Sequence, residues 1–145
     1  MEAVILCGLQ GAGKTTLFRD RFAATHAHVS LDVVRTRARE AELLRTCLDE
    51  GRSFVVDNTN PTPAARRRYV ELARAAGCKV IGYLVEPDAG EAFARAGIPP
   101  GRVAATARAL QPPTPKEGFD ELWHATAAPG GGWRIEPLLT TPPLF

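Results

Sequence analysis

The stretch "GLQGAGKTT", from Gly8 to Thr16, constrains the fold of this chain more than any other feature of the sequence. It follows the short apolar run "EAVILC", which is typical of a buried strand, and it leads into a segment with helical spacing. Gly8, Gly13, Lys14 and Thr15 complete the pattern G-x-x-x-x-G-K-[ST] between that strand and that helix. This context predicts a glycine-rich loop of the P-loop type.

The chemistry of this loop indicates that it binds phosphate. Glycines let backbone N–H groups converge on phosphate oxygens, and the N-terminus of the following helix adds a partial positive charge. Lys14 brings a full charge to the outer phosphates, and the Thr15 hydroxyl can ligate Mg²⁺. The sequence therefore predicts binding of ATP together with Mg²⁺, with Thr15 as the metal ligand. The predicted ATP-binding residues are Gly8, Gly11, Ala12, Gly13, Lys14, Thr15 and Thr16.

Strands and helices are predicted to alternate along the chain. Besides residues 2–7, apolar runs predict strands over 26–30, 53–57 and 79–86, and an edge strand over about 132–138. Helices are predicted over 14–25, 33–50 and 63–76, the last capped by Thr62, and residues 118–125 are predicted to be a short helical piece. This alternation predicts an α/β fold of three layers, a parallel sheet with helices on both faces. The chain of 145 residues suits a single domain over 1–145.

Composition limits the partners and the compartment. The formal net charge is only +2, so overall charge gives no case for nucleic-acid binding. The three cysteines show no zinc or disulfide pattern, and Cys7 and Cys78 are predicted to be core residues. Neither a signal peptide nor a run of the roughly 20 apolar residues of a membrane helix is found. We therefore expect a cytoplasmic protein with no membrane partner.

Polar side chains that could act on an acceptor follow the second predicted strand. The segment "HVSLDVVR" places Asp32 just beyond that strand and Arg35 three residues later. Ligands bind at the carboxyl ends of parallel strands, where a carboxylate can accept a proton from an attacking hydroxyl and an arginine can hold a phosphate of the acceptor. The spacing equally allows Asp32 to cap the helix and Arg35 to form a surface ion pair.

The segment "FVVDNTNP" adds Asp57 at the end of the third predicted strand, where a carboxylate of a P-loop protein lies near either the magnesium water shell or the acceptor site. Asn58 and Thr59 bring polar groups to the same edge, whereas Asn60, before Pro61, favours an Asx-type turn. Other conspicuous side chains are predicted to be structural. The arginines at 66–68 should be a solvated helix surface, the three histidines lack the spacing of metal ligands, and the two tryptophans should pack in the core or at its rim.

Four segments, "GLQGAGKTT", "HVSLDVVR", "DNTNPTPAARRRYVELARAAG" and "PPTPKEGFDELW", resemble the polynucleotide 5′-hydroxyl kinases in order and spacing. The resemblance is to the kinase domain of the bifunctional polynucleotide kinase-phosphatases and covers nearly the whole chain. It implies transfer of the γ-phosphate of ATP to the 5′-hydroxyl of a DNA or RNA end, under a short lid at about residues 88–111. Any phosphatase or ligase that works with the chain would then be a separate partner.

The resemblance also implies roles for individual residues. Lys14 and Thr15 would bind ATP and magnesium, and Asp32 would be the general base for the 5′-hydroxyl. The residues that it implies on the acceptor side are Arg35, which would contact the acceptor phosphate, with Asp57, Asn58 and Thr59 beside it.

The predicted lid departs from the family pattern, because it is short and lacks an "N-N-x-x-R"-like cluster. Arg95, Arg102 and Arg108 are the arginines available there, and Arg95 is predicted to stabilise the moving phosphoryl group as a catalytic residue. Two other functions stay open from the residues themselves. One is a P-loop kinase of a small metabolite or antibiotic hydroxyl, and the other is a nucleotide-binding module without turnover.

Overall fold

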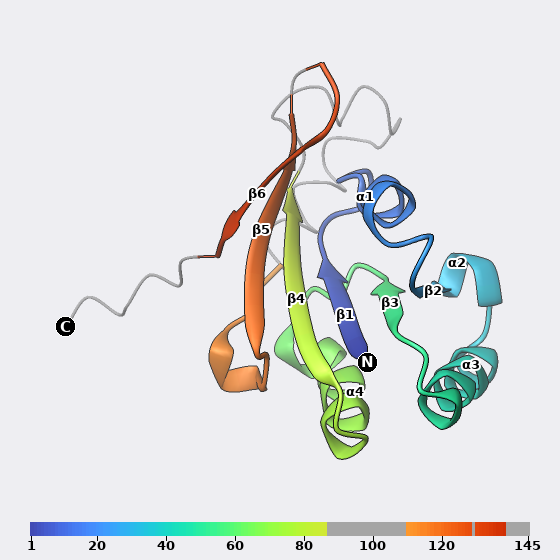
Figure 1. Cartoon of the computed structure of the whole chain (residues 1–145). Coiled ribbons are helices and arrows are strands. Elements are labelled where there is room, and N and C mark those ends of the chain that lie inside the picture. Colours follow the sequence, from blue (N-terminus) through green and yellow to red (C-terminus); the bar gives the residue numbers. More distant parts are fainter. Residues whose placement is uncertain (87–109, 129, 139–145) are drawn as a thin grey trace.

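The computed structural model describes residues 1–86, 110–128 and 130–138, and these build one sheet of six strands in the order β2-β3-β1-β4-β5-β6 (Figure 1). The strands are β1 (Glu2–Cys7), β2 (Ala27–Val29), β3 (Phe54–Asp57), β4 (Lys79–Glu86), β5 (Glu121–Ala127) and β6 (Trp133–Pro137). All neighbours pair in parallel except β6, which runs antiparallel to β5 at the edge. The mostly parallel α/β fold predicted from the sequence is thus confirmed.

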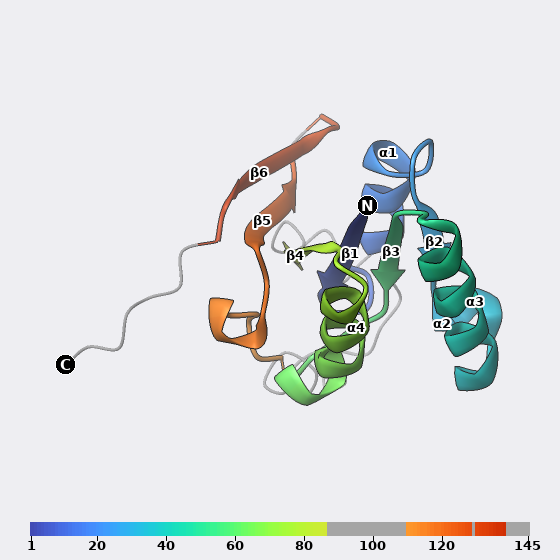
Figure 2. The same ribbon diagram turned by 60° about the horizontal axis from the view of Figure 1, so that its bottom comes forward.

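Helices cover both faces of this sheet, as Figure 2 shows. They are α1 (Lys14–Arg21), α2 (Leu31–Val34), α3 (Arg37–Glu50) and α4 (Pro63–Ala75), with a short 3-10 helix, η1, over Pro115–Glu117. Successive side chains of a strand point to opposite faces. Leu6 of β1 therefore packs in one cluster with Leu17 of α1, and Ile5 packs in the other with Leu44 of α3 and Tyr69 of α4. The result is the predicted arrangement of three layers.

The helix predicted over residues 33–50 is wrong in one respect, because the structure divides it into α2 and α3. Arg35 ends α2 with a φ of 74°, in the left-handed region, and its N–H still donates to the carbonyl of Leu31. Thr36 then begins a new helix, since its hydroxyl accepts a hydrogen bond of 3.1 Å from the N–H of Arg39. The break turns α2 into a separate turn of helix beside the carboxyl end of β3.

The short helical piece predicted over 118–125 is also wrong, because most of it is strand β5. Its backbone pairs with β4 from Ile81 opposite Glu121 to Glu86 opposite Thr126. The local sequence leaves helix and strand close in preference, and the open edge of β4 decides between them. The predicted edge strand at 132–138 is confirmed as β6. The predicted lid lies outside the described residues, apart from Leu110 and Gln111.

The three cysteines are free and buried. Burial raises the pKa of the Cys7 thiol to about 12, and burial likewise raises the pKa of Cys47 and Cys78. Cys7 and Cys78 therefore belong to the core, as predicted. In the part of the chain that the structure describes, no helix has the length and apolar character needed to span a membrane.

These pKa shifts predict that the native protein resists thiol reagents. At pH 8 an aromatic disulfide should modify none of the three cysteines quickly, because burial limits access to all three thiols. Cys7 in addition carries about 10³-fold less thiolate than an ordinary thiol. All three should react once denaturant is added. The folded chain also retains thiol protons above pH 9 that the unfolded chain loses, so stability should fall as pH rises beyond that point. Rapid labelling of a native thiol would contradict the buried assignment.

Candidate functional site

A cleft of about 640 Å³ opens at the carboxyl ends of the parallel strands. Its walls come from the glycine-rich loop, the start of α2, the end of β3 and the β5–β6 hairpin. The lining residues are Gln10, Gly11, Ala12, Gly13, Lys14, Thr15, Thr16, Leu31, Asp32, Asp57, Asn58, Thr59, Ala127 and Trp133. The cleft thus brings together most of the residues predicted for ATP and for the acceptor.

The glycine-rich loop is shaped as its sequence predicts. Gly13 has a φ of 98° and stands at the N-terminus of α1. The ammonium of Lys14 lies over the loop and donates to the carbonyls of Gly8 at 3.0 Å and Leu9 at 2.9 Å. Burial lowers the pKa of Lys14 below its ordinary value, and nearby acidic groups, Asp57 foremost, oppose that shift. A partly buried ammonium that is held by two carbonyls can exchange them for phosphate oxygens.

Gly8 has a structural role behind the loop. A Cβ added to Gly8 would lie 2.5 Å from the carbonyl oxygen of Val85 on β4, so only glycine permits this approach. Its N–H donates to the carbonyl of Thr59 at 3.1 Å. Unlike the other predicted ATP-binding residues, Gly8 does not line the cleft. It links the loop to the end of β3.

Asp57 is the best-buried carboxylate that lines the cleft, with a relative exposure of 6%. It accepts hydrogen bonds of 2.8 Å from the Thr15 hydroxyl and from Nε2 of His28. Burial raises the pKa of Asp57, but these hydrogen bonds and the charge of Lys14 outweigh that effect and hold it below its ordinary value. The ionised carboxylate and the Thr15 hydroxyl supply oxygen ligands of the kind that suits Mg²⁺, directly or through water. The residues present therefore fit a magnesium ion at this point.

Sequence analysis missed the part played by His28. The imidazole stacks on Phe18 with ring centroids 4.2 Å apart and an interplanar angle of 19°, and this packing aims Nε2 at Asp57. The two residues meet because β2 pairs in parallel with β3, with His28 opposite Val55. The signal in the sequence was a histidine within a short apolar strand, and only the register reveals its partner.

Asp32 lines the cleft from the first turn of α2. Ser30 precedes that helix as its cap residue, so Asp32 does not take the capping position that the sequence left open. Within the described residues its carboxylate makes no hydrogen bond or ion pair, and the residue is exposed. An exposed carboxylate in the cleft that contains Lys14 and Thr15 is available to a ligand.

Asn58 holds α2 in place rather than simply facing a ligand. Its Oδ1 accepts a hydrogen bond of 3.0 Å from the N–H of Leu31, the residue before Asp32. Its Nδ2 donates to Glu40 at 3.1 Å and to the Tyr69 hydroxyl at 3.2 Å. Asn58 therefore connects the end of β3 to the turn that carries Asp32.

Glu40 is a second residue that sequence analysis missed. It is 1% exposed and accepts hydrogen bonds from Tyr69, Arg37 and Asn58. Burial and the neighbouring Glu40 carboxylate raise the pKa of the Tyr69 hydroxyl, so Tyr69 stays a donor. This network lies directly behind Asn58 and braces α2 against α3 and α4.

The prediction that the arginines at 66–68 form a solvated surface is wrong for Arg66. Its side chain is fully buried and binds both carboxylate oxygens of Glu117, at 2.7 and 3.0 Å. It also donates to the carbonyl of Asn60 at 2.7 Å. Asn60 has a φ of 47° and its Nδ2 donates to the carbonyl of Leu6 at 2.8 Å. Arg66 thus fixes the loop after β3 from behind.

Replacing Arg66 with alanine should lower the free energy of unfolding by roughly 3 kcal/mol, because the Glu117 carboxylate would remain largely buried without its partner. Urea denaturation followed by circular dichroism measures this loss. Arg67→Ala on the same helix is the control, since Arg67 is exposed, and it should change stability by no more than about 0.5 kcal/mol. Equal stabilities of the two variants would contradict the bracing role.

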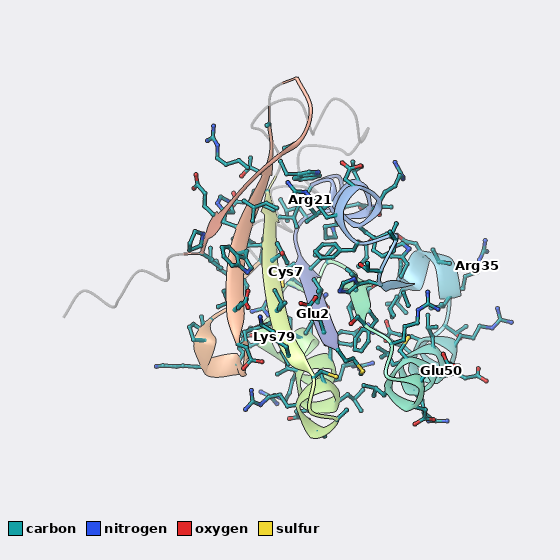
Figure 3. The ribbon with its side chains drawn as sticks, viewed as in Figure 1. Glu2, Cys7, Arg21, Arg35, Glu50 and Lys79 are labelled. Atoms are coloured by element: carbon teal, nitrogen blue, oxygen red, sulfur yellow. The ribbon has the colours of Figure 1, made fainter. Side chains whose placement is uncertain are left out.

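The remaining predicted residues lie apart from the cleft or outside the described chain. Arg35 is exposed, does not line the cleft, and lies at the outer side of α2 in Figure 3. Among the described residues it has no ion-pair partner, so the surface ion pair left open by the sequence is not found. Arg95, Arg102 and Arg108 fall within residues that the structure does not describe. Trp123 and Trp133 pack against the core, as predicted, and Trp133 also lines the cleft.

Comparison with solved structures places the fold among P-loop proteins of the kinase type. A gluconokinase from Sinorhizobium meliloti 1021 superposes with a TM-score of 0.59 at 12% identity, over 86% of this chain and 82% of the gluconokinase chain. Kti12 from Chaetomium thermophilum, in complex with ADP-AlF3, gives a TM-score of 0.60 at 14% identity, over 84% and 87% of the two chains. Identities this low establish the fold alone.

Sequence comparison adds a curated relative and a family. A bifunctional polynucleotide phosphatase/kinase from Schizosaccharomyces pombe is 30% identical over 74 residues, which is 50% of this chain. The aligned part spans only 18% of that protein's length. The family model described as "AAA domain" matches residues 4–98, from β1 to beyond β4 and including the glycine-rich loop. The chain therefore belongs to the AAA domain family and has the P-loop fold seen in kinases.

Proposed function

We propose that the chain is an ATP-dependent phosphotransferase that moves the γ-phosphate of ATP to the 5′-hydroxyl of a nucleic-acid end. The observation that carries this proposal is the meeting of four groups in one cleft: the Lys14 ammonium, the hydrogen-bonded pair Thr15 and Asp57, and the exposed carboxylate of Asp32. The partial similarity to a polynucleotide phosphatase/kinase supports the acceptor class.

The chemistry assigned to these residues is charge neutralisation, orientation and proton transfer. Mg²⁺ held at Thr15 and Asp57 would supply positive charge to the outer phosphates. Lys14 neutralises charge on the transferred group, and the loop amides orient it. Asp32 accepts the proton of the acceptor hydroxyl while the hydroxyl oxygen bonds to the γ-phosphorus. The bond from that phosphorus to the β-γ bridging oxygen breaks at the same time, and ADP leaves.

Arg35 is assigned to a phosphate of the acceptor strand beyond the cleft. A nucleic-acid strand whose 5′-hydroxyl reaches Asp32 must leave the cleft within a nucleotide or two. Arg35 is exposed just past the turn of helix that carries Asp32, and it has no ion-pair partner among the described residues. Its position suits a contact with a phosphate on the 3′ side of the attacking nucleoside, and does not suit a contact with a small acceptor that lacks such a phosphate.

Arg35→Ala should therefore change acceptor preference. Wild-type protein should use a nucleoside 3′-phosphate or an oligonucleotide about 10- to 150-fold more efficiently than a bare nucleoside, because charge-assisted contacts are strong. The variant should lose most of this preference and keep its activity on the nucleoside, as measured by kcat/KM for each acceptor. Acceptor binding should weaken with salt at a shallow slope, about one.

The matched control is Arg45→Ala, since Arg45 is an exposed arginine of α3 that does not line the cleft. It should leave the preference intact. If Arg35→Ala instead depresses all acceptors equally, Arg35 serves the fold or the transferred group.

A panel of acceptors tests the proposed function against its alternatives. Labelled ATP and Mg²⁺ are offered with 5′-hydroxyl DNA, 5′-hydroxyl RNA, nucleosides and small alcohols. Transfer to nucleic-acid ends supports the proposal. Transfer only to a small alcohol would identify a metabolite or antibiotic kinase, and tight ATP binding with no transfer to any acceptor would identify a nucleotide-binding module.

A further inference from the structure

We propose that Trp133 forms the base-binding wall of the cleft and stacks on the purine base of the donor nucleotide. This inference rests on the proposed function in one respect, namely that a nucleoside triphosphate occupies the glycine-rich loop. Trp133 then binds the base of the donor nucleotide, which the loop itself does not bind.

The described walls of the cleft leave one side of the glycine-rich loop for the base of the nucleotide. The glycine-rich loop lies in the middle, and Asp32, Asp57 and Asn58 line the side that belongs to α2 and β3. Ala127 and Trp133 line the cleft from the β5–β6 hairpin, on the other side of the sheet order from β3. With the terminal phosphate directed toward Asp32, the nucleoside extends toward the hairpin.

Trp133 is held beside the phosphate loop by three contacts. Its backbone pairs with Ala127 in the antiparallel ladder. Its indole N–H donates to Asp20 of α1 at 3.0 Å. The far edge of the ring lies over the loop, since a Cβ added to Gly13 would be 3.2 Å from the Cη2 atom of Trp133. These contacts fix the ring at the point where a nucleotide leaves the loop.

The indole ring of Trp133 is suited to stacking on a base rather than to recognising the base by hydrogen bonds. Trp133 is the one aromatic residue among the described residues that line the cleft, and it is only partly buried. Base–aromatic stacking tolerates different bases because every base has a π-face. The indole N–H is already bound to Asp20, so the ring offers area rather than a hydrogen bond. A purine, which has the larger face, should therefore bind more tightly than a pyrimidine.

The test compares ATP with inorganic tripolyphosphate, which carries the phosphates without the base. Titration calorimetry on the full chain gives both affinities for wild type, Trp133→Leu and Trp133→Phe. Trp133→Leu should weaken ATP binding by roughly 5- to 150-fold, the range of a single base stack, and leave tripolyphosphate binding unchanged. Trp133→Phe keeps an aromatic face and should recover most of the ATP affinity. Trp123→Leu is the control, because Trp123 does not line the cleft.

Fluorescence gives a second readout that does not depend on loss of affinity. The chain has two tryptophans, so Trp123→Phe leaves Trp133 as the sole indole. ATP should quench its emission and tripolyphosphate should not.

Three results would overturn the inference. The first is an unchanged ATP affinity in Trp133→Leu. The second is an equal loss of affinity for ATP and for tripolyphosphate, which would mean that Trp133 only shapes the loop. The third is an equal ATP affinity of Trp133→Leu and Trp133→Phe. If wild-type protein binds neither ATP nor tripolyphosphate, the proposed function fails as well. Binding of ATP that is insensitive to Trp133 removes this inference alone.

Discussion

Replacing Lys14 with alanine is expected to lower the rate of phosphoryl transfer by at least about 10³-fold, the upper range for loss of one charge-stabilising donor. Lys14 is the one lysine that lines the cleft among the described residues, and its ammonium lies within hydrogen-bond distance of the loop carbonyls of Gly8 and Leu9. In the proposed mechanism the lost charge is the one that faces the transferred phosphoryl group. Initial rates with labelled ATP and a 5′-hydroxyl oligonucleotide measure the effect.

The control for this variant is Lys116→Ala, because Lys116 is exposed on η1 and lies away from the cleft. It should retain wild-type rates. Circular dichroism checks that both variants are folded. Undiminished turnover in Lys14→Ala would reject the P-loop kinase mechanism.

Asp32→Asn is expected to lower kcat by about 10²- to 10⁴-fold while ATP affinity changes little. The substitution keeps the shape of the side chain and removes its ability to accept a proton, and general-base catalysis contributes about this much. Fold stability should also change little, since the Asp32 side chain is exposed and makes no hydrogen bond with the described residues. The measurement separates kcat from the Kd for ATP.

Asp49→Asn, an exposed aspartate of α3 outside the cleft, is the matched control. It should leave both quantities unchanged. If Asp32→Asn instead weakens ATP binding strongly while the remaining bound enzyme turns over normally, Asp32 belongs to the magnesium or nucleotide site and another group must take the proton.

Much of the fold was predictable because its signals are local. The loop from Gly8 to Thr16 carries its own strand before it and its own helix after it. Thr62 and Pro63 mark the start of α4, where the Thr62 hydroxyl accepts from the N–H of Ala65 at 3.1 Å. Asp32 and Asp57 were predicted to lie near the loop because each lies at the carboxyl end of an apolar strand of a parallel sheet, and both line the cleft.

The supporting contacts were not predictable, because they join residues far apart in the chain. His28 reaches Asp57 across 29 residues, and Arg66 reaches Glu117 across 51. A charged residue such as Arg66 is expected at the surface unless it is paired. The residues near Arg66 in the sequence do not indicate that Glu117 is its ion-pair partner. The strand β5 was missed for a related reason, since its backbone is fixed by the edge of β4 rather than by its own residues.

The most direct test of the central claim is a matched pair of oligonucleotides that differ only at the 5′ end. One ends in a 5′-hydroxyl and the other in a 5′-phosphate, and each is incubated with γ-labelled ATP, Mg²⁺ and either wild-type protein or Lys14→Ala. The account predicts that label appears only on the 5′-hydroxyl strand, only with wild-type protein, and is removed by a phosphatase. Equal labelling of both strands, or no labelling of the 5′-hydroxyl strand by protein that binds ATP, would contradict it.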